Sequence, residues 1–298
     1  MSRVHVRVPA TTANIGPGFD CLGCALSMYA DFTCEIIESG LEITGCPEAF
    51  RNEDNLFVQA FRLAEKKMGV EPLAIRLHID TEVPVSRGLG SSATLLAGGA
   101  AAANALHGNL MTDHQLVEVC NDIEGHPDNI APAVLGGMCV SFVENGVPNT
   151  VPVNVAENVG FIALIPNFET ETKAMRAVLP KQIPFADAVF NSSRLAVLLY
   201  AFAQGDLKLI GEALDDRLHQ PYRKPLIHEY FRAEKAALDA GCAAFCISGS
   251  GSTCLAVVDA AGENEVAGKI QRSLADSIYE WKVVALHIDN DGAHVVEN

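Results

Sequence analysis

The sequence lacks the long apolar runs that would place it in or across a membrane. Its N-terminus reads Met-Ser-Arg-Val-His-Val-Arg-Val, which has no apolar stretch of the signal-peptide kind. No run approaches the roughly 18 apolar residues, free of charge and helix breakers, that a membrane-spanning helix needs. These absences predict a cytoplasmic protein.

Positive charge is also scarce. Lys and Arg total 21 against 37 Asp and Glu, a formal net charge of −16. Such a chain repels nucleic acid and anionic lipid at long range, so neither is expected as a partner. An anionic ligand would have to be held by local features, which is feasible because salt screens charges beyond about 8 Å.

Cysteine pairs with metal-ligand spacing are almost missing. The nine cysteines include a single CxxC, Cys21-Leu-Gly-Cys24, and most of the others lie in apolar runs. We therefore expect reduced core cysteines and neither a disulfide framework nor a zinc site.

What is present is enough for a two-domain globular protein. The chain has 298 residues, of which 49% are hydrophobic and 19% charged. Strands and helices interleave throughout, which predicts an α+β fold. The expected strands are 4–8 (stopping at Pro9), 33–37, 74–79, 137–143, 161–166, 246–247, 253–258 and 282–288, and the expected helices are 55–68, 92–106, 112–123, 187–203, 206–219, 229–240 and 264–277. We place the domain boundary so that residues 1–155 form one domain and residues 156–298 the other.

The stretch 84–93, Pro-Val-Ser-Arg-Gly-Leu-Gly-Ser-Ser-Ala, carries the strongest functional signal because it precedes an Ala-rich helix. Glycines let the backbone approach a ligand, and the free N–H groups of a helix N-terminus attract anions. The stretch is neither a Walker A loop nor GxGxxG. It therefore indicates an anion cradle made of uncharged groups, the alternative being a turn that merely caps a buried helix.

Three further stretches are weaker signals. Residues 246–253 form a glycine-serine turn between apolar strands, which alone is more typical of a tight hairpin. Residues 8–20 are rich in Thr, Asn, Gly and Pro after the first strand, and residues 124–129, Glu-Gly-His-Pro-Asp-Asn, follow a helix. Each is also compatible with an ordinary surface turn.

Together and in this order, these motifs resemble those of the GHMP kinases, over nearly the whole chain. The family's first motif resembles Pro9–Gly18, its second Pro84–Ala93 and its third Ile247–Thr253. The stretches 9–23, 124–132 and 216–226 most resemble the branch of the family that acts on L-homoserine. The resemblance implies an N-terminal domain like the second domain of ribosomal protein S5, a C-terminal ferredoxin-like domain, and a site between them.

The activity implied by the resemblance is Mg²⁺-dependent transfer of a phosphoryl group from ATP to the hydroxyl of L-homoserine, a step toward threonine. Homodimers are common in the family. The ATP-binding residues carried over by motif are Asn55, Leu56, Pro84, Val85, Ser86, Arg87, Gly88, Leu89, Gly90, Ser91, Ser92, Ala93 and Thr94.

Ser92 and Glu118 are the expected Mg²⁺ ligands and, with Asn129, the catalytic residues. Glu118 is carried over by its position eight residues before His126, and Glu124 is a rival candidate. Both side chains offer the oxygen ligands that Mg²⁺ prefers.

The resemblance also assigns the substrate pocket. Asp20 would pair with the ammonium of the amino acid, and Arg176 and Arg223 would bind its carboxylate in the forked geometry of guanidinium. The remaining pocket residues would be Asn14, His126, Asn129 and Thr172.

One departure from related kinases concerns the catalytic base. Mevalonate and galactose kinases place an aspartate near the acceptor hydroxyl, where this chain has Asn129. Asparagine takes no proton at pH 7, so we expect catalysis mainly by electrostatics, with the adjacent Asp128 as an open alternative base. Ser252, where the third motif usually has proline, removes no polar group.

Three competing functions remain at this point. The same fold could act on another alcohol, such as mevalonate or a diphosphocytidyl methylerythritol. A non-catalytic nucleotide-binding protein is a second alternative, although retained Ser92 and Glu118 argue against it. A Rossmann oxidoreductase is a poor third, since no GxGxxG follows a strand.

Overall fold

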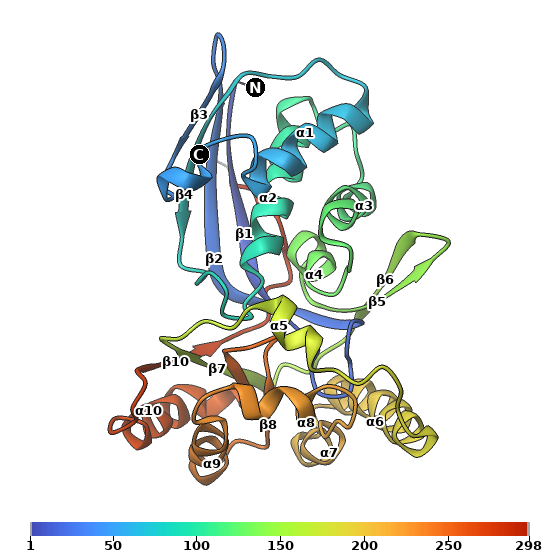
Figure 1. The fold of residues 1–298 in the computed structure, drawn as a ribbon, viewed down its shortest axis with the longest axis vertical. Coiled ribbons are helices and arrows are strands. Elements are labelled where there is room, and N and C mark those ends of the chain that lie inside the picture. The colour runs from blue at the N-terminus through green and yellow to red at the C-terminus, as the bar shows by residue number, and fades with distance from the viewer. Residues whose placement is uncertain (1, 297–298) are drawn as a thin grey trace.

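The first half of the chain is built on a large sheet with helices packed against it (Figure 1). The computed structural model describes residues 2–296, and within these residues the sheet has seven strands. The strand order is β11-β1-β2-β4-β3, and the hairpin β5–β6 joins through β2. All pairs are antiparallel except β3 with β4. The strands are β1 (Arg3–Ala13), β2 (Leu22–Ile36), β3 (Leu41–Thr44), β4 (Ile75–Thr81), β5 (Met138–Glu144), β6 (Val147–Val153) and β11 (His294–Val295).

The helices of this half are α1 (Leu56–Met68), α2 (Ser91–Leu106), α3 (Asp113–Glu124) and α4 (Ile130–Leu135). The most buried of them is α2, whose small residues allow close packing on two sides. A Cβ on Gly99 would lie 2.0 Å from the Phe57 carbonyl oxygen, and one on Gly98 would lie 2.6 Å from the Phe32 ring. These glycines therefore let α2 pack closely against both the sheet and α1.

The second half has its own four-stranded antiparallel sheet, in the order β10-β7-β9-β8, within the described residues. Helices lie along the outer side of this sheet (Figure 1). The strands are β7 (Val159–Pro166), β8 (Ala244–Ile247), β9 (Cys254–Asp259) and β10 (Trp281–Leu286), and the helices are α5 (Thr172–Ala177), α6 (Phe185–Gln204), α7 (Leu207–Ala213), α8 (Gln220–Arg223), α9 (Tyr230–Ala240) and α10 (Glu263–Ser273).

Several predicted elements have bounds other than expected, and two of these differences have a clear local cause. The first strand does not stop at Pro9 but continues to Ala13, because a register shift after Pro9 accommodates the ring while pairing with β2 resumes at Ala10. The helix expected over 206–219 ends at Ala213, because the Asp216 carboxylate accepts hydrogen bonds from the backbone N–H groups of residues 218–220 instead.

The chain also returns to the first sheet after β10. Leu26 bridges to Ile288, and β11 pairs with β1, where Val6 lies opposite Val295. A two-residue strand carries too little pattern to be predicted from sequence. Its pairing ties the C-terminal tail to the N-terminal half.

Two structural findings bear on the compositional expectations. All nine cysteines are free thiols. Among residues 2–296, no helix combines the length and the apolar character that crossing a bilayer requires.

Candidate active site

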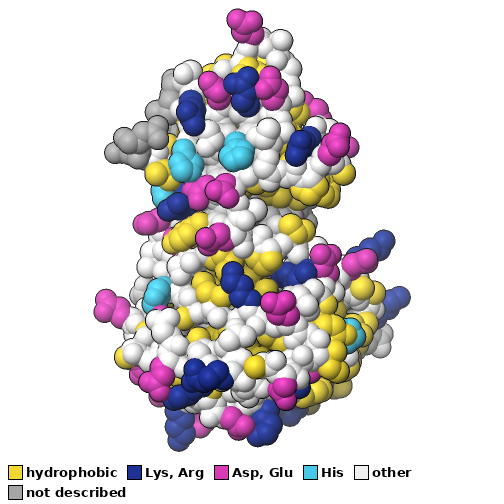
Figure 2. Space-filling view, turned by 90° about the vertical axis from the view of Figure 1, so that its left-hand side faces the viewer, with side chains coloured by type: hydrophobic (Ala, Val, Ile, Leu, Met, Phe, Trp, Pro, Cys, Tyr) yellow, Lys and Arg dark blue, Asp and Glu magenta, His cyan; other side chains and the backbone are white. Residues whose placement is uncertain are grey.

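A cavity of about 580 Å³ is lined by residues of both halves of the chain, from Asn14 to Asn129 and from Thr170 to Ser250. This volume is typical of a small-molecule site. Figure 2 shows the narrowed waist between the halves, with hydrophobic and Lys or Arg side chains gathered just below it. The cavity has a glycine-serine loop, an apolar end and a charged end.

The glycine-serine loop turns its carbonyl groups toward protein. The carbonyl of Leu89 accepts from Thr11 N at 3.1 Å, and that of Arg87 accepts from Thr253 N at 3.0 Å. The carbonyl of Gly88 accepts from the Ser248 hydroxyl at 2.6 Å. Helix α2 then begins at Ser91, and its first N–H groups have no partners within the helix. With the loop lining the cavity, these amides are available to an anion.

Glycine is required at two positions of this loop. Gly88 has φ +75°, and a Cβ there would lie 2.2 Å from the Ser248 carbonyl oxygen. Gly90 has φ +69°, and a Cβ there would lie 2.0 Å from Thr11 Oγ1. The first, second and third sequence motifs therefore meet at this loop. These contacts explain why glycine stands at positions 88 and 90, which three unrelated surface turns would not explain.

A carboxylate lies beside the loop serine. Ser92 donates from Oγ to Glu124 Oε2 at 2.6 Å, and both residues line the cavity. Glu124 is the last residue of α3, where Gly125 at φ +88° ends the helix and lets the chain turn toward the site. Glu118, about 1.7 turns earlier on α3, does not line the cavity.

The apolar end of the cavity lies where α1 begins. Asn55 caps α1 by accepting from Phe57 N at 3.0 Å and donates to the Phe50 carbonyl at 2.9 Å. These bonds fix the loop before α1. The apolar lining here comes from Phe32, Pro47, Phe50, Leu56 and Ile79.

The charged end contains a bidentate ion pair. Arg176 donates to both carboxylate oxygens of Asp20, each at 2.8 Å, and its guanidinium lies 5.4 Å from the Phe19 ring. Asp20 in turn donates its backbone N–H to Asn14 Oδ1 at 2.8 Å. Thr172 and Ser250 lie 3.2 Å apart through their hydroxyls at the same end.

Arg223 approaches from the floor of this end and is only 1% exposed. It donates to the carbonyls of Met175 and Gly249 at 3.1 and 3.2 Å. Burial, with Arg176 nearby, lowers the pKa of Arg223 to about 10, so the guanidinium still carries its charge at pH 7.

Asn129, which also lines the cavity, is fixed by a contact with the first motif. Its Oδ1 accepts from Thr11 Oγ1 at 2.9 Å. The neighbouring Asp128 is 2% exposed and uses one oxygen, Oδ1, for both Asn129 N at 3.0 Å and His126 Nδ1 at 3.2 Å. The hydrogen bond with Asp128 raises the pKa of His126, although burial opposes the shift.

Comparison with known proteins settles the family. The family model described as "GHMP kinases N terminal domain" matches residues 55–137, and the one described as "GHMP kinases C terminal" matches residues 198–276. A protein of Clostridium beijerinckii named homoserine kinase is 40% identical over 295 residues, 99% of each chain. The chain belongs to the GHMP kinase family.

Solved structures agree with this membership. A crystal structure of homoserine kinase from Cytophaga hutchinsonii superposes with a TM-score of 0.91 at 27% identity, covering 99% of this chain and 98% of that one. The mevalonate kinase of L. major, solved with R-mevalonate, has a TM-score of 0.72 at 15% identity over 93% and 94% of the two chains, and shares the fold. The predicted two-domain GHMP kinase architecture is confirmed.

This GHMP kinase brings most of the predicted site residues to one cavity. Those that do not line it are Pro84, Leu89, Asp20 and Glu118. Leu89 is fully buried in the core, and Asp20 reaches the site through Arg176. Lining residues outside the predicted set are chiefly the apolar ones near α1, together with Thr170 and Ser250. Ser250 lies inside the third motif, whereas Thr170 and Phe50 carry no sequence signal.

Proposed function

We propose that this GHMP kinase transfers the γ-phosphoryl group of ATP to the hydroxyl of L-homoserine, giving ADP and O-phospho-L-homoserine on the way to threonine. The observation that carries this proposal is one cavity that joins the N-terminus of α2 to a cluster of Asp20, Arg176 and Arg223. A full-length relative carrying the name homoserine kinase supports the choice of substrate.

The charged end suits a zwitterionic amino acid. Homoserine carries an ammonium and a carboxylate on one carbon, and Asp20 and the two arginines offer the complementary charges. Arg176 and Asp20 already satisfy one another at 2.8 Å. A zwitterion can exchange partners with both members of this pair and leave neither charge unpaired, whereas an anion such as mevalonate would pair with an arginine and leave Asp20 without its partner.

ATP would occupy the rest of the cavity. The adenine would lie at the apolar end beside α1, and the phosphates at the start of α2, where neutral amides can hold them in a protein of charge −16. ATP and homoserine would then face each other across Asn129.

The residues present fit Mg²⁺. This cation is usually bound by one or two carboxylates plus substrate phosphates, and Ser92 Oγ and Glu124 Oε2 place two hard oxygens together beside the loop. Bound there, Mg²⁺ would neutralise charge on the phosphates. We propose Ser92 with Glu124 as its ligands; the earlier expectation of Glu118 now stands as the alternative, and it lies outside the cavity lining.

Catalysis by positioning and charge, without a side-chain base, suits the residues near the acceptor. Asn129 cannot accept a proton at pH 7. Asp128 Oδ1 already accepts hydrogen bonds from Asn129 N and His126 Nδ1. Phosphoryl transfer needs little more than alignment and stabilised charge. The acceptor proton would leave to solvent or to a phosphate oxygen.

A coupled assay of ADP release tests the substrate. With Mg²⁺ and ATP, kcat/KM should be highest for L-homoserine among alcohols that include mevalonate and 4-diphosphocytidyl-methylerythritol. Higher turnover of another alcohol would reject homoserine, and no Mg²⁺-dependent ADP release with any of them would favour the non-catalytic alternative.

Paired variants test the metal ligands. Glu124→Gln should lower kcat by about 100-fold or more, as expected when a ligand to transition-state charge is lost. Glu118→Gln, on the same helix but away from the cavity, is the matched control and should change kcat little. The reverse ranking would restore Glu118 as the ligand.

A further inference from the structure

Arg223 is held by three hydrogen bonds that involve only two of its three nitrogens. Nε donates to the Met175 carbonyl at 3.1 Å. Nη1 donates to the Gly249 carbonyl at 3.2 Å and to His219 Nδ1 at 3.4 Å. Within residues 2–296, Nη2 makes no hydrogen bond, and Arg223 lines the cavity, so the two N–H groups of Nη2 are left for a ligand.

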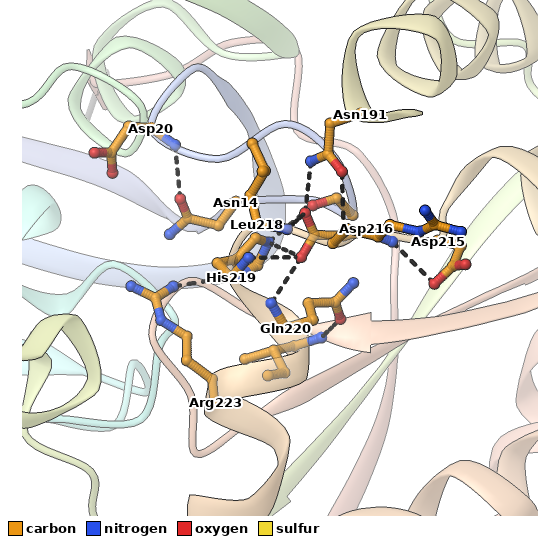
Figure 3. A network of polar contacts seen from close by, with 12 residues as sticks. Asn14, Asp20, Asn191, Asp215, Asp216, Leu218, His219, Gln220 and Arg223 are labelled. Carbon is orange, nitrogen blue, oxygen red and sulfur yellow. Dashed lines mark hydrogen bonds and ion pairs between the residues drawn. The ribbon is translucent and has the colours of Figure 1, made fainter. Parts of the chain in front are cut away.

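The third of these bonds requires one tautomer of His219. The His219 Nε2 atom lies 2.8 Å from the carbonyl oxygen of Gly16, which can only accept, so Nε2 carries the proton. In a neutral imidazole the other nitrogen then has a lone pair, and Nδ1 can accept from Arg223. Figure 3 shows His219 lying between Arg223 and Asp216.

The surroundings of His219 favour this neutral form. The ring is fully buried, and burial lowers its pKa although Asp216 Oδ2 lies 3.6 Å from Nε2. Its other neighbours are the guanidinium of Arg223 and the Phe19 ring at 5.2 Å. A protonated ring would present a donor to Arg223 and lose the bond.

A network behind His219 fixes the ring in place. Asp216 Oδ2 accepts from the backbone N–H of His219 at 2.9 Å and of Gln220 at 2.7 Å, while its Oδ1 accepts from Asn191 Nδ2 on α6 at 2.6 Å. Burial raises the pKa of Asp216, but the hydrogen bonds from Asn191 and from the backbone N–H groups lower it, and the pKa is lowered overall, so the carboxylate stays charged. Figure 3 shows the chain of contacts from Asn191 to Arg223.

From this geometry we propose that His219 is a positioning residue for substrate recognition: as a neutral acceptor it orients Arg223 so that Nη2 faces the carboxylate of the amino acid. The proposal rests on the proposed function, which supplies that carboxylate. His219 touches no substrate itself, and its contribution is to restrict the rotation of the guanidinium.

Two matched variants separate the two bonds of His219. In His219→Gln the side-chain amide can still donate to the Gly16 carbonyl but has no acceptor at the Nδ1 position. In His219→Asn the carboxamide oxygen can replace Nδ1, and the donor to Gly16 is lost. Both variants leave the residues of the phosphate loop unchanged.

The measurement is kcat/KM with L-homoserine and with 3-aminopropan-1-ol, which is homoserine with hydrogen in place of the carboxylate. We expect His219→Gln to lose about tenfold or more with L-homoserine, the usual effect of a hydrogen bond to a charged group, and little with 3-aminopropan-1-ol or in KM for ATP. His219→Asn should stay within a few-fold of the wild type. Equal losses with both substrates, or a larger loss in His219→Asn, would overturn the proposal.

A second measurement keeps the test independent of how the variants fold and of which substrate the wild type prefers. The ¹⁵N spectrum of the wild-type imidazoles should show His219 with a protonated Nε2 and a bare Nδ1 at neutral pH. A protonated Nδ1 would overturn the proposal. A wild type that phosphorylates no amino alcohol, with the expected tautomer intact, would instead reject homoserine as substrate.

Discussion

Asn129 is the residue at which this chain departs from kinases that use an aspartate base. We predict that Asn129→Asp does not raise kcat and lowers kcat/KM, because the new carboxylate can still accept from Thr11 Oγ1 but would repel the phosphates expected beside it. The ADP-release assay measures it. Increased kcat in this variant would show that a general base at position 129 speeds the reaction and would contradict catalysis without a side-chain base.

The pair of His126 and Asp128 gives a pH-dependent contribution to stability. The pKa of His126 is raised by its hydrogen bond with Asp128. The stabilisation is therefore fully present below the pKa of an unfolded histidine, about 6.5, and is lost as the pH rises through the higher folded value. We predict that Asp128→Asn lowers the pKa of His126 in an NMR titration. An unchanged midpoint would contradict this cause.

At the residue scale, the sequence indicated several side chains that line the cavity, but it did not indicate which residues they contact. Arg176, Arg223, Asn14 and His126 line the cavity, as the resemblance implied. The resemblance suggested Glu118, by its position eight residues before His126, with Glu124 as the rival, and it is Glu124 that lies beside Ser92. Nothing in the sequence paired Arg176 with Asp20, since 156 residues separate them.

Among the elements, the loop before α2 depends most on a distant segment. Gly88→Ala would put a Cβ 2.2 Å from the Ser248 carbonyl, in addition to the strain of φ +75°. Gly108→Ala is the matched control, because it has φ +88° and open space around it. We predict a loss of about 1 kcal/mol from backbone strain in the control and a clearly larger loss for Gly88→Ala.

Thermal unfolding of both variants measures this difference, and KM for ATP should rise only in Gly88→Ala. Equal shifts in Tm would mean that the contact with Ser248 is soft and that strain alone requires glycine at position 88.

Helices with strong caps were predictable from sequence, and elements set by distant contacts were not. The capping box of Thr112 and Gln115 opens α3, Asn55 caps α1, and the helices expected over 112–123 and 55–68 are both present. The helix expected over 206–219 ends at Ala213. Beyond it, the Asp216 carboxylate accepts hydrogen bonds from the backbone N–H groups of residues 218–220 and from the side chain of Asn191 on α6. Local helix propensity carries no information about a hydrogen-bond partner on another helix.

On the scale of the whole molecule, both halves of the chain contribute to the cavity that we propose as the nucleotide site. The backbone N–H groups of Gly249 and Thr253, from the second half, donate to carbonyls of Ala13 and Arg87 in the first. We predict that ATP with Mg²⁺ slows hydrogen exchange in the turn 248–253 as well as in the loop 84–93, because bound nucleotide suppresses opening of both. Mass-spectrometric exchange measures it, with segment 206–213 as the reference that should not change.

The division at residue 155 remains our proposal for the two domains, and the tail complicates it. Residues 294–295 pair with β1, so the second segment contributes a strand to the first sheet. Two-domain architecture followed from the length of the chain and from its resemblance to the family. The return of the tail did not, because it rests on two residues.

The contact between Gly88 and Ser248 has a consequence for synthesis of the protein. The ribosome must add 160 residues after Gly88 before it reaches Ser248, whose hydroxyl donates to the Gly88 carbonyl. Until residue 248 has been made, the loop 84–93 lacks this contact. We expect a growing chain to give this loop its final shape only after most of the sequence has been synthesised.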